Sequence, residues 1–293
     1  MLPPPWDRSS LIVIVAVRVY DDDRLQHVRL DGKICLVTGS GRGIGRATAV
    51  EMARQGAETV IVCDVSDGAG ADTVRLVEEA GGQSLFCHCD VSDSHQVATL
   101  MQEVGERFGR LDVLHNNAAL VDTQLTEQTR IDQIPDEVWD RLYAVNVRGT
   151  WLCIKHAAPL LRRASAAAIV NCASISSYVS FSGESCYCST KGAILMLTRS
   201  TALDLAPFGV RCNCYCPGTI DTPMVANQLE ASGDEQRYRR ELGGLHLFPE
   251  PRLGTPEEVA RLVCFLASDA ASFVNGASYL VDGGALAWRG TSV

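Results

Sequence analysis

Lysine is scarce in this chain of 293 residues: Lys33, Lys155 and Lys191 are the only lysines, and every other basic residue is an arginine. Lys and Arg together number 26 against 35 Asp and Glu, which leaves a formal net charge of −9. Proteins that bind nucleic acid or an anionic membrane surface normally present a basic face. The sequence has no basic excess, so we expect no nucleic acid and no membrane as a partner.

A long hydrophobic run is also absent. The apolar stretch Leu11–Val17 near the start is far shorter than the roughly 20 residues of a bilayer span, and its flanks do not form a signal peptide. We expect residues 1–28 to be an N-terminal extension that is poorly ordered or loosely docked, with a docked extra strand as the alternative. With no targeting signal in view, we expect a cytoplasmic protein.

Zinc-type cysteine spacing is missing as well, although the chain has 12 cysteines. The closest groups, Cys87/Cys89, Cys186/Cys188 and Cys212/Cys214/Cys216, are spaced C-x-C and not C-x-x-C. Alternation of this kind is typical of one face of a strand. We therefore expect reduced, buried thiols and no metal site. A zinc-binding or thiol redox role is the alternative, and elemental analysis of the purified protein would test it.

Short apolar runs alternate with helical stretches from residue 30 onward. This pattern predicts one domain with a doubly wound parallel sheet and helices on both faces, an α/β fold. The predicted strands are residues 34–38, 60–63, 84–89, 111–115, 169–172, 210–215 and 278–281, and the first three predicted helices are residues 46–55, 71–80 and 97–108.

A glycine-rich segment, Thr38–Gly45, lies between the first predicted strand and the first predicted helix. Glycines there allow a tight turn and a close backbone approach to a pyrophosphate, whose charge the helix start attracts. The spacing is T-G-x-x-x-G-x-G, which differs from the G-x-G-x-x-G fingerprint. We interpret the segment as a dinucleotide loop, and a glycine-rich turn without a ligand is the alternative.

Two aspartates follow the next two predicted strands. Asp64, nineteen residues after Gly45, is placed to accept both ribose hydroxyls of NAD and to repel the 2′-phosphate of NADP; a helix N-cap or a surface charge is the alternative. Arg42 in the loop would favour that phosphate, but the repulsion by Asp64 is direct, so NAD is the predicted cofactor. Asp90 with Val91 could hold the adenine edge, or Asp90 could be a helix N-cap.

A tyrosine and a lysine, Tyr187 and Lys191, are four residues apart, which places them on one face of a helix. A free phenol has a pKa of about 10, too high for a base at neutral pH. A neighbouring ammonium and a cationic nicotinamide would favour the phenolate and lower that pKa. Ser174, thirteen residues earlier, follows a predicted strand and completes a candidate acid–base set.

In order and spacing, these motifs resemble the classical short-chain dehydrogenase/reductase family. The resemblance rests on the Thr38–Gly45 loop, Asn116-Asn117-Ala118, Asn146, Ser174, Tyr187-x-x-x-Lys191 and Pro217-Gly218, and it covers about residues 29–285. It implies a single Rossmann-type domain, a homotetramer or homodimer, and hydride transfer between a nicotinamide cofactor and a carbonyl or secondary alcohol. An NAD-dependent alcohol dehydrogenase of class EC 1.1.1 is the expected enzyme, with a small-molecule substrate.

The resemblance also assigns roles to residues. Tyr187 is the general acid/base, Lys191 lowers its pKa and holds the nicotinamide ribose, Ser174 hydrogen-bonds the reacting oxygen, and Asn146 anchors a proton-relay water. The cofactor-binding residues carried over or predicted are Gly39, Arg42, Gly43, Ile44, Gly45, Asp64, Asp90, Val91, Asn117, Ala118, Tyr187, Lys191, Pro217, Gly218, Thr219, Ile220 and Thr222.

The substrate end departs from the family pattern. Ala119 replaces the usual glycine and would narrow the cofactor cleft if its φ had to be positive. Glu184 stands near the position of an arginine found in 3-hydroxybutyrate and deoxy-sugar-acid dehydrogenases, which puts a carboxylate substrate in doubt. We expect a substrate lid at about residues 222–250, a C-terminal tail at 286–293, and a hydroxy acid, sugar or cyclic diol as substrate.

Two other functions stay open. An NADPH-dependent carbonyl reductase is disfavoured by Asp64. A non-catalytic dinucleotide-sensing protein would be expected to have lost Tyr187 or Lys191, and both are present.

Overall fold

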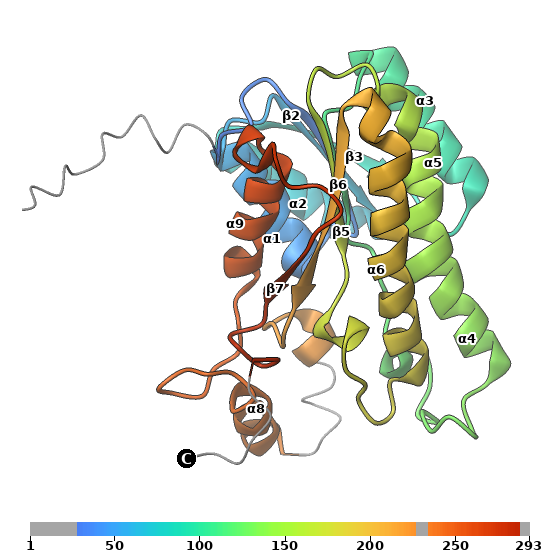
Figure 1. The fold of residues 1–293 in the computed structure, drawn as a ribbon, viewed down its shortest axis with the longest axis vertical. Helices are drawn as coiled ribbons and strands as arrows, with labels where there is room; N and C mark the ends of the chain where they lie inside the picture. The colour runs from blue at the N-terminus through green and yellow to red at the C-terminus, as the bar shows by residue number, and fades with distance from the viewer. Residues whose placement is uncertain (1–27, 227–233, 288–293) are drawn as a thin grey trace, which may run out of the picture.

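A computed structural model describes residues 28–226 and 234–287, so most of the expected N-terminal extension, part of the lid and most of the C-terminal tail lie outside the described residues. Seven parallel strands form one sheet in the order β3-β2-β1-β4-β5-β6-β7 (Figure 1). The strands are β1 Ile34–Thr38, β2 Thr59–Asp64, β3 Gln83–His88, β4 Val113–Asn116, β5 Ala167–Cys172, β6 Val210–Pro217 and β7 Ser278–Val281. The predicted doubly wound parallel sheet is confirmed.

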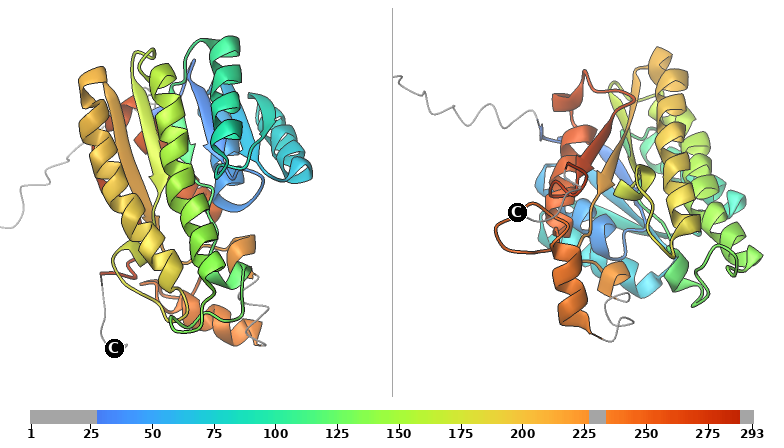
Figure 2. Two further views of the ribbon diagram at one scale, coloured as in Figure 1. Left: turned by 90° about the vertical axis from the view of Figure 1, so that its right-hand side faces the viewer. Right: turned by 60° about the horizontal axis from the view of Figure 1, so that its bottom comes forward.

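Helices cover both faces of this sheet, with α1, α2 and α9 on one face and α3, α5 and α6 on the other (Figures 1 and 2). The helices are α1 Gly43–Arg54, α2 Asp67–Glu79, α3 Ser94–Phe108, α4 Asp136–Leu142, α5 Thr150–Leu161, α6 Ser185–Leu205, α8 Glu235–Gly243 and α9 Pro256–Ala267. Short 3-10 helices are η2 Asp122–Gln124, η4 Ile175–Ser177, η5 Ala206–Phe208 and η6 Asp269–Ala271. None of the helices in the described ranges is long and apolar enough to cross a membrane.

Two hydrophobic cores lie on opposite faces of the sheet because successive strand residues point to opposite sides. In β1, Ile34 and Leu36 belong to the core under α3 and α5, whereas Cys35 and Val37 belong to the core under α1 and α9. Strands buried on both faces have no polar alternation, which is why β1 has only apolar residues before Thr38.

One continuous helical stretch joins α4 and α5 through a π-helical segment, Tyr143–Gly149. Such segments are rare and are frequent at functional sites, and this one carries Asn146. On the following helix, Lys155 is exposed with its ammonium 5.0 Å from the ring centre of Trp151.

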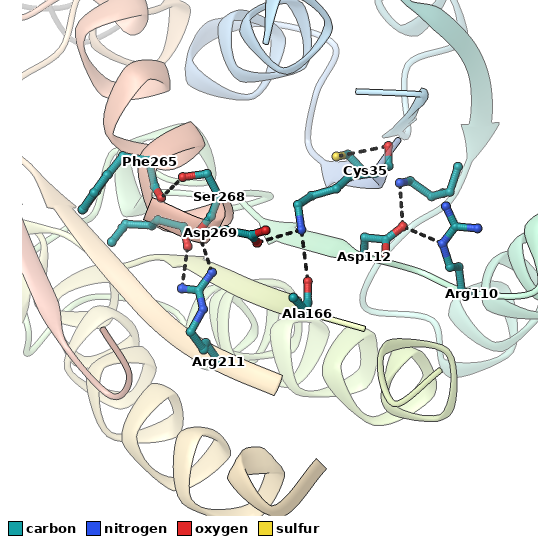
Figure 3. Close-up of polar contacts among 11 residues, drawn as sticks. Cys35, Arg110, Asp112, Ala166, Arg211, Phe265, Ser268 and Asp269 are labelled. Carbon is teal, nitrogen blue, oxygen red and sulfur yellow. Dashed lines mark hydrogen bonds and ion pairs between the residues drawn. The ribbon is translucent and has the colours of Figure 1, made fainter. Parts of the chain in front are cut away.

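Ion pairs gather at the amino ends of the strands, the end opposite the cofactor loop (Figure 3). Lys33 pairs with Asp269 (3.1 Å) and Arg110 with Asp112 (3.0 Å). Asp112 is buried, and its carboxylate also accepts the backbone N–H of Ile34 at 2.8 Å. Buried carboxylates are tolerated when hydrogen bonds replace their water, so this network fixes the entry into β1 and β4.

Candidate active site

A cavity of about 600 Å³ opens at the carboxyl ends of the strands. Ligands of open parallel sheets bind at this edge. Its wall contains all the predicted cofactor residues except Gly45, and all the predicted catalytic residues except Asn146. Residues more than 170 positions apart in the chain, such as Gly39 and Pro217, therefore line one cavity.

The glycine loop connects β1 to α1, as its position in the sequence predicted, but the helix begins at Gly43 and not at Arg46. Gly39 has a φ of +61°, and a Cβ there would lie 2.7 Å from Ala118 Cα. Gly45 lies behind the wall, where a Cβ would meet the Gly39 carbonyl oxygen at 2.3 Å. The loop thus has no room for side chains at these two positions.

The start of α1 fits a phosphate group. The Arg42 side chain does not cap the helix, and the first turn carries no acidic residue. Backbone N–H groups at a helix start bind anions when no side chain satisfies them. A pyrophosphate therefore suits the loop and the first turn of α1.

Polar side chains that are linked by hydrogen bonds support the glycine loop. The Asn117 side-chain amide donates to the Thr38 and Gly39 carbonyls (3.1 and 3.0 Å). Its oxygen accepts the Tyr215 hydroxyl at 3.4 Å, and that hydroxyl hydrogen-bonds His115 Nε2 at 3.0 Å. Burial lowers the pKa of His115 to about 3, so the ring is neutral at pH 7. His115 and Tyr215 were not predicted, although polar residues inside apolar strands are a signal that could have pointed to them.

Asp64 ends β2 and faces the cavity, in agreement with its predicted position. Its Oδ2 accepts the Gly41 N–H at 2.8 Å and its Oδ1 accepts the Ser66 N–H at 3.0 Å. The N-cap of α2 is Ser66, so Asp64 has no capping role. Because each carboxylate oxygen can accept more than one hydrogen bond, Asp64 can shape the loop and still receive ribose hydroxyls.

Asp90 lies in the cavity wall beside Val91, just after β3, the strand that pairs with the end of β2 at Asp64. Its Oδ2 pairs with Arg141 at 3.1 Å, and its Oδ1 accepts the Ser92 N–H at 2.9 Å. Burial favours the neutral acid, but the hydrogen bonds from Ser92 and Arg141 outweigh it and lower the pKa of Asp90. The N-cap of α3 is Asp93, so Asp90 is not the helix N-cap that was the alternative interpretation. Sequence analysis did not predict Arg141, because it lies on α4, 51 residues after Asp90.

Tyr187 and Lys191 lie one turn apart on α6, and Ser174 follows β5. Ser174, Tyr187 and Lys191 all line the cavity wall. Burial of the phenol and nearby Cys172 raise the pKa of Tyr187 above its ordinary value, and Ser174 only partly offsets this. The expected lowering depends on Lys191 together with a cationic nicotinamide, so it stays a prediction. In this structure Lys191 Nζ donates to the Cys172 carbonyl at 2.7 Å and lies 5.4 Å from the Tyr187 ring centre.

Asn146 is buried behind the wall and does not line the cavity. Its side-chain amide bonds both backbone groups of Leu120 (2.8 and 2.9 Å) and donates to the Thr190 hydroxyl at 3.0 Å. The amide therefore joins the loop after β4 to α6. The proton-relay water expected at Asn146 stays a prediction.

The substrate end of the cavity combines apolar residues with one carboxylate. Apolar wall residues there are Leu120, Val121, Phe181, Met224, Val225, Leu242 and Leu245. Glu184, at the N-cap position of α6, lines the same wall. Within the described ranges only glycines have a positive φ, so Ala119 fits without the strain that was anticipated.

The cysteines are free thiols. Cys212, Cys214 and Cys216 are buried at alternating positions of β6, as the spacing predicted. The strand interpretation is wrong for Cys186 and Cys188, which lie on α6 because the helix start at Ser185 includes them. Among the described residues, no group of three or more His, Cys, Asp or Glu side chains could hold a metal ion.

Comparisons with known proteins agree with this geometry. A family model described as enoyl-(acyl carrier protein) reductase matches residues 39–285. The meso-2,3-butanediol dehydrogenase of Serratia marcescens is 38% identical over 263 residues, which cover 90% of this chain and 98% of that protein. The cis-4-hydroxycyclohexanecarboxylate dehydrogenase of Sinomonas cyclohexanicum is 38% identical over 252 residues, which cover 86% of this chain and 96% of that protein.

A solved structure matches as well. Carveol dehydrogenase from Mycobacterium avium in complex with NAD has a TM-score of 0.82 and 25% identity, and the match covers 89% of this chain and 99% of that chain. The relatives each span most of the chain, and the family model includes the cofactor loop from Gly39 and the helix with Tyr187 and Lys191. The chain therefore belongs to the classical short-chain dehydrogenase/reductase family of oxidoreductases.

Proposed function

We propose that this protein is an NAD(H)-dependent dehydrogenase that interconverts a secondary alcohol and its ketone, with Tyr187 as the general acid/base. The observation that carries the proposal is that Ser174, Tyr187 and Lys191 line the same cavity as the glycine loop. A proton-transfer group and a dinucleotide cradle then face the same space, as hydride transfer to or from an alcohol requires.

Different residues along the cavity bind different parts of the cofactor. The glycine loop and the first turn of α1 hold the pyrophosphate, Asp64 the ribose, and Asp90 with Val91 the adenine edge. Pro217, Gly218, Thr219, Ile220 and Thr222 surround the nicotinamide end. The bound nicotinamide ring supplies the hydride acceptor for alcohol oxidation and the hydride donor for ketone reduction.

Three residues, Ser174, Tyr187 and Lys191, take part in proton transfer. The Ser174 hydroxyl donates to the reacting oxygen and stabilises the charge that develops there. A phenol with a raised pKa is protonated at neutral pH, and it is ready to protonate that oxygen during ketone reduction. Alcohol oxidation needs the phenolate, which the Lys191 ammonium, 5.4 Å from the Tyr187 ring centre, favours through its charge.

NAD is the proposed cofactor because the Asp64 carboxylate would repel a 2′-phosphate. The NAD complex of the carveol dehydrogenase relative supports this choice. Asp64→Ala should raise the KM for NAD about tenfold or more, since hydrogen bonds to a charged group are lost, and should lower the KM for NADP. If the unaltered enzyme instead prefers NADPH, Arg42 governs the choice and the NADPH-dependent carbonyl reductase is correct.

A neutral secondary alcohol or diol is the proposed substrate, in preference to a hydroxy acid. Burial is the main cause of the raised pKa of Tyr187, and the charge of Glu184 in the largely apolar wall raises it further. That charge would also repel a carboxylate on the substrate. The match to a meso-2,3-butanediol dehydrogenase supports a neutral diol. The match to a cis-4-hydroxycyclohexanecarboxylate dehydrogenase keeps cyclic carboxylates in the test set.

NADH formation from NAD is the test, measured with vicinal diols, cyclic alcohols, sugars and hydroxy acids. We expect turnover of neutral alcohols and a loss of about 10²–10⁴-fold in the Tyr187→Phe variant. Glu184→Gln should raise kcat/KM for acidic substrates relative to neutral ones, because the repelling charge is removed. Binding of NAD without turnover of any alcohol would favour the non-catalytic sensor.

A further inference from the structure

Asp122 is a fully buried carboxylate close to the catalytic helix. It begins η2 in the loop that follows β4, and its relative exposure is 0%. Burying a carboxylate is costly unless hydrogen bonds replace its water. Its partners therefore show what the carboxylate stabilises.

Both oxygens of Asp122 accept backbone N–H groups at the start of α6. Oδ1 accepts from Cys186 at 3.2 Å and Oδ2 from Tyr187 at 2.9 Å. These are the second and third residues of the helix, whose N–H groups have no partner within the helix. The side chain of the N-cap residue, Glu184, does not cap them. Asp122 thus caps α6 from 64 residues upstream, and its negative charge suits the positive end of the helix dipole.

The backbone carbonyl of Tyr187 is held as well. It accepts the Thr190 hydroxyl at 2.7 Å, and that hydroxyl accepts the Asn146 amide at 3.0 Å. Asn146 in turn bonds both backbone groups of Leu120, two residues before Asp122. The N–H and the C=O of Tyr187 are therefore both tied to the loop formed by residues 120–122.

That loop also forms part of the substrate wall, through Leu120 and Val121, with Gln124 just beyond it. We infer that Asp122 is a positioning residue for the reaction: it fixes the backbone of Tyr187 relative to the substrate wall, so that the phenol meets the reacting oxygen. The inference rests on the proposed role of Tyr187 as general acid/base. Asp122 itself is absent from the cavity wall and acts only through the helix.

Substitution of Asp122 should lower kcat and leave binding unchanged. In Asp122→Ala we expect kcat to fall about 10–10²-fold, since misplacement of a reacting group by about 1 Å can cost 10²-fold. The isosteric Asp122→Asn keeps one acceptor and should lose less. The KM for the alcohol and the Kd for NADH should change by less than about threefold, because Asp122 touches neither.

Asp112→Asn is the matched control. It also changes a buried carboxylate that accepts a backbone N–H, but at the opposite end of the sheet, near Arg110 (Figure 3). If Asp122 only stabilised the fold, the Asp122 and Asp112 variants would show the same fall in kcat per folded molecule whenever they showed the same fall in Tm. We expect the Asp112 variant to keep kcat within about threefold of the parent.

Hydrogen exchange of the amides of residues 186–188 gives a readout that needs no substrate. Asp122→Ala should speed exchange there by about tenfold or more and leave β1 and α9 unchanged. Unchanged exchange, or faster exchange with unchanged kcat, would overturn the inference. A parent enzyme that binds NADH but turns over no alcohol would contradict the proposed function instead, and the exchange data would then decide whether Asp122 holds the helix.

Discussion

His115 should make the stability of this protein depend on pH in a calculable way. Burial lowers its pKa from 6.5 to about 3. Between these values the unfolded chain binds one more proton than the folded chain, so the free energy of unfolding rises with pH. The contribution of His115 is complete above about pH 6.5 and is lost as the pH falls. With these two pKa values, the loss between pH 7 and pH 5 is about 2 kcal/mol.

The variant His115→Gln tests this number because glutamine does not titrate and can still hydrogen-bond the Tyr215 hydroxyl. Urea unfolding of parent and variant at pH 7 and pH 5, at one protein concentration, gives the change for each. The parent should lose about 2 kcal/mol more than the variant, because all other titrating groups are shared. His95→Gln, at an exposed position on α3, should behave like the parent. Equal losses in the parent and in His115→Gln would refute the reasoning.

Two further predictions concern the cofactor site. Arg141→Ala removes the ion pair that orients Asp90 (3.1 Å); the KM for NAD should rise about 3–10-fold with kcat unchanged, and a fall in kcat with constant KM would contradict this role. Gly45→Ala places a Cβ against the Gly39 carbonyl oxygen, whereas Gly68→Ala on α2 meets nothing within 4 Å. NADH titration should show at least about tenfold weaker binding for Gly45→Ala and no change for Gly68→Ala, and equal binding by both would contradict the packing argument.

The sheet and the glycine loop could be predicted because their signals are local. Apolar runs, the glycines before α1 and the four-residue spacing of Tyr187 and Lys191 need no knowledge of distant partners. Element ends were less accurate: α1 begins at Gly43 and not at Arg46, because glycines have poor helix propensity and so do not signal a helix start. The π-helical segment that carries Asn146 has no sequence pattern of its own.

The contacts that hold the site together could not be predicted. Asp122 reaches Tyr187 across 65 residues, and His115 reaches Tyr215 across 100. Neither pair follows a helical or strand period, since each depends on which strands become neighbours in the sheet. The pKa of Tyr187 in this structure could not be predicted either: four-residue spacing places Lys191 on the same helix face, but it shows neither the burial that raises the pKa nor the bond of the ammonium to the Cys172 carbonyl.

The three lysines differ in their surroundings, and this has a consequence for chemical attachment. Lys191 is buried in the cavity wall, Lys33 is half-buried and paired with Asp269, and Lys155 alone is exposed. Among the lysines, amine-directed reagents will therefore find one ready side chain, on α5, whereas the α-amino group titrates at a lower pH and can be labelled separately. An enzyme coupled to a support through Lys155 alone would be held in one orientation, with its cofactor entrance unmodified.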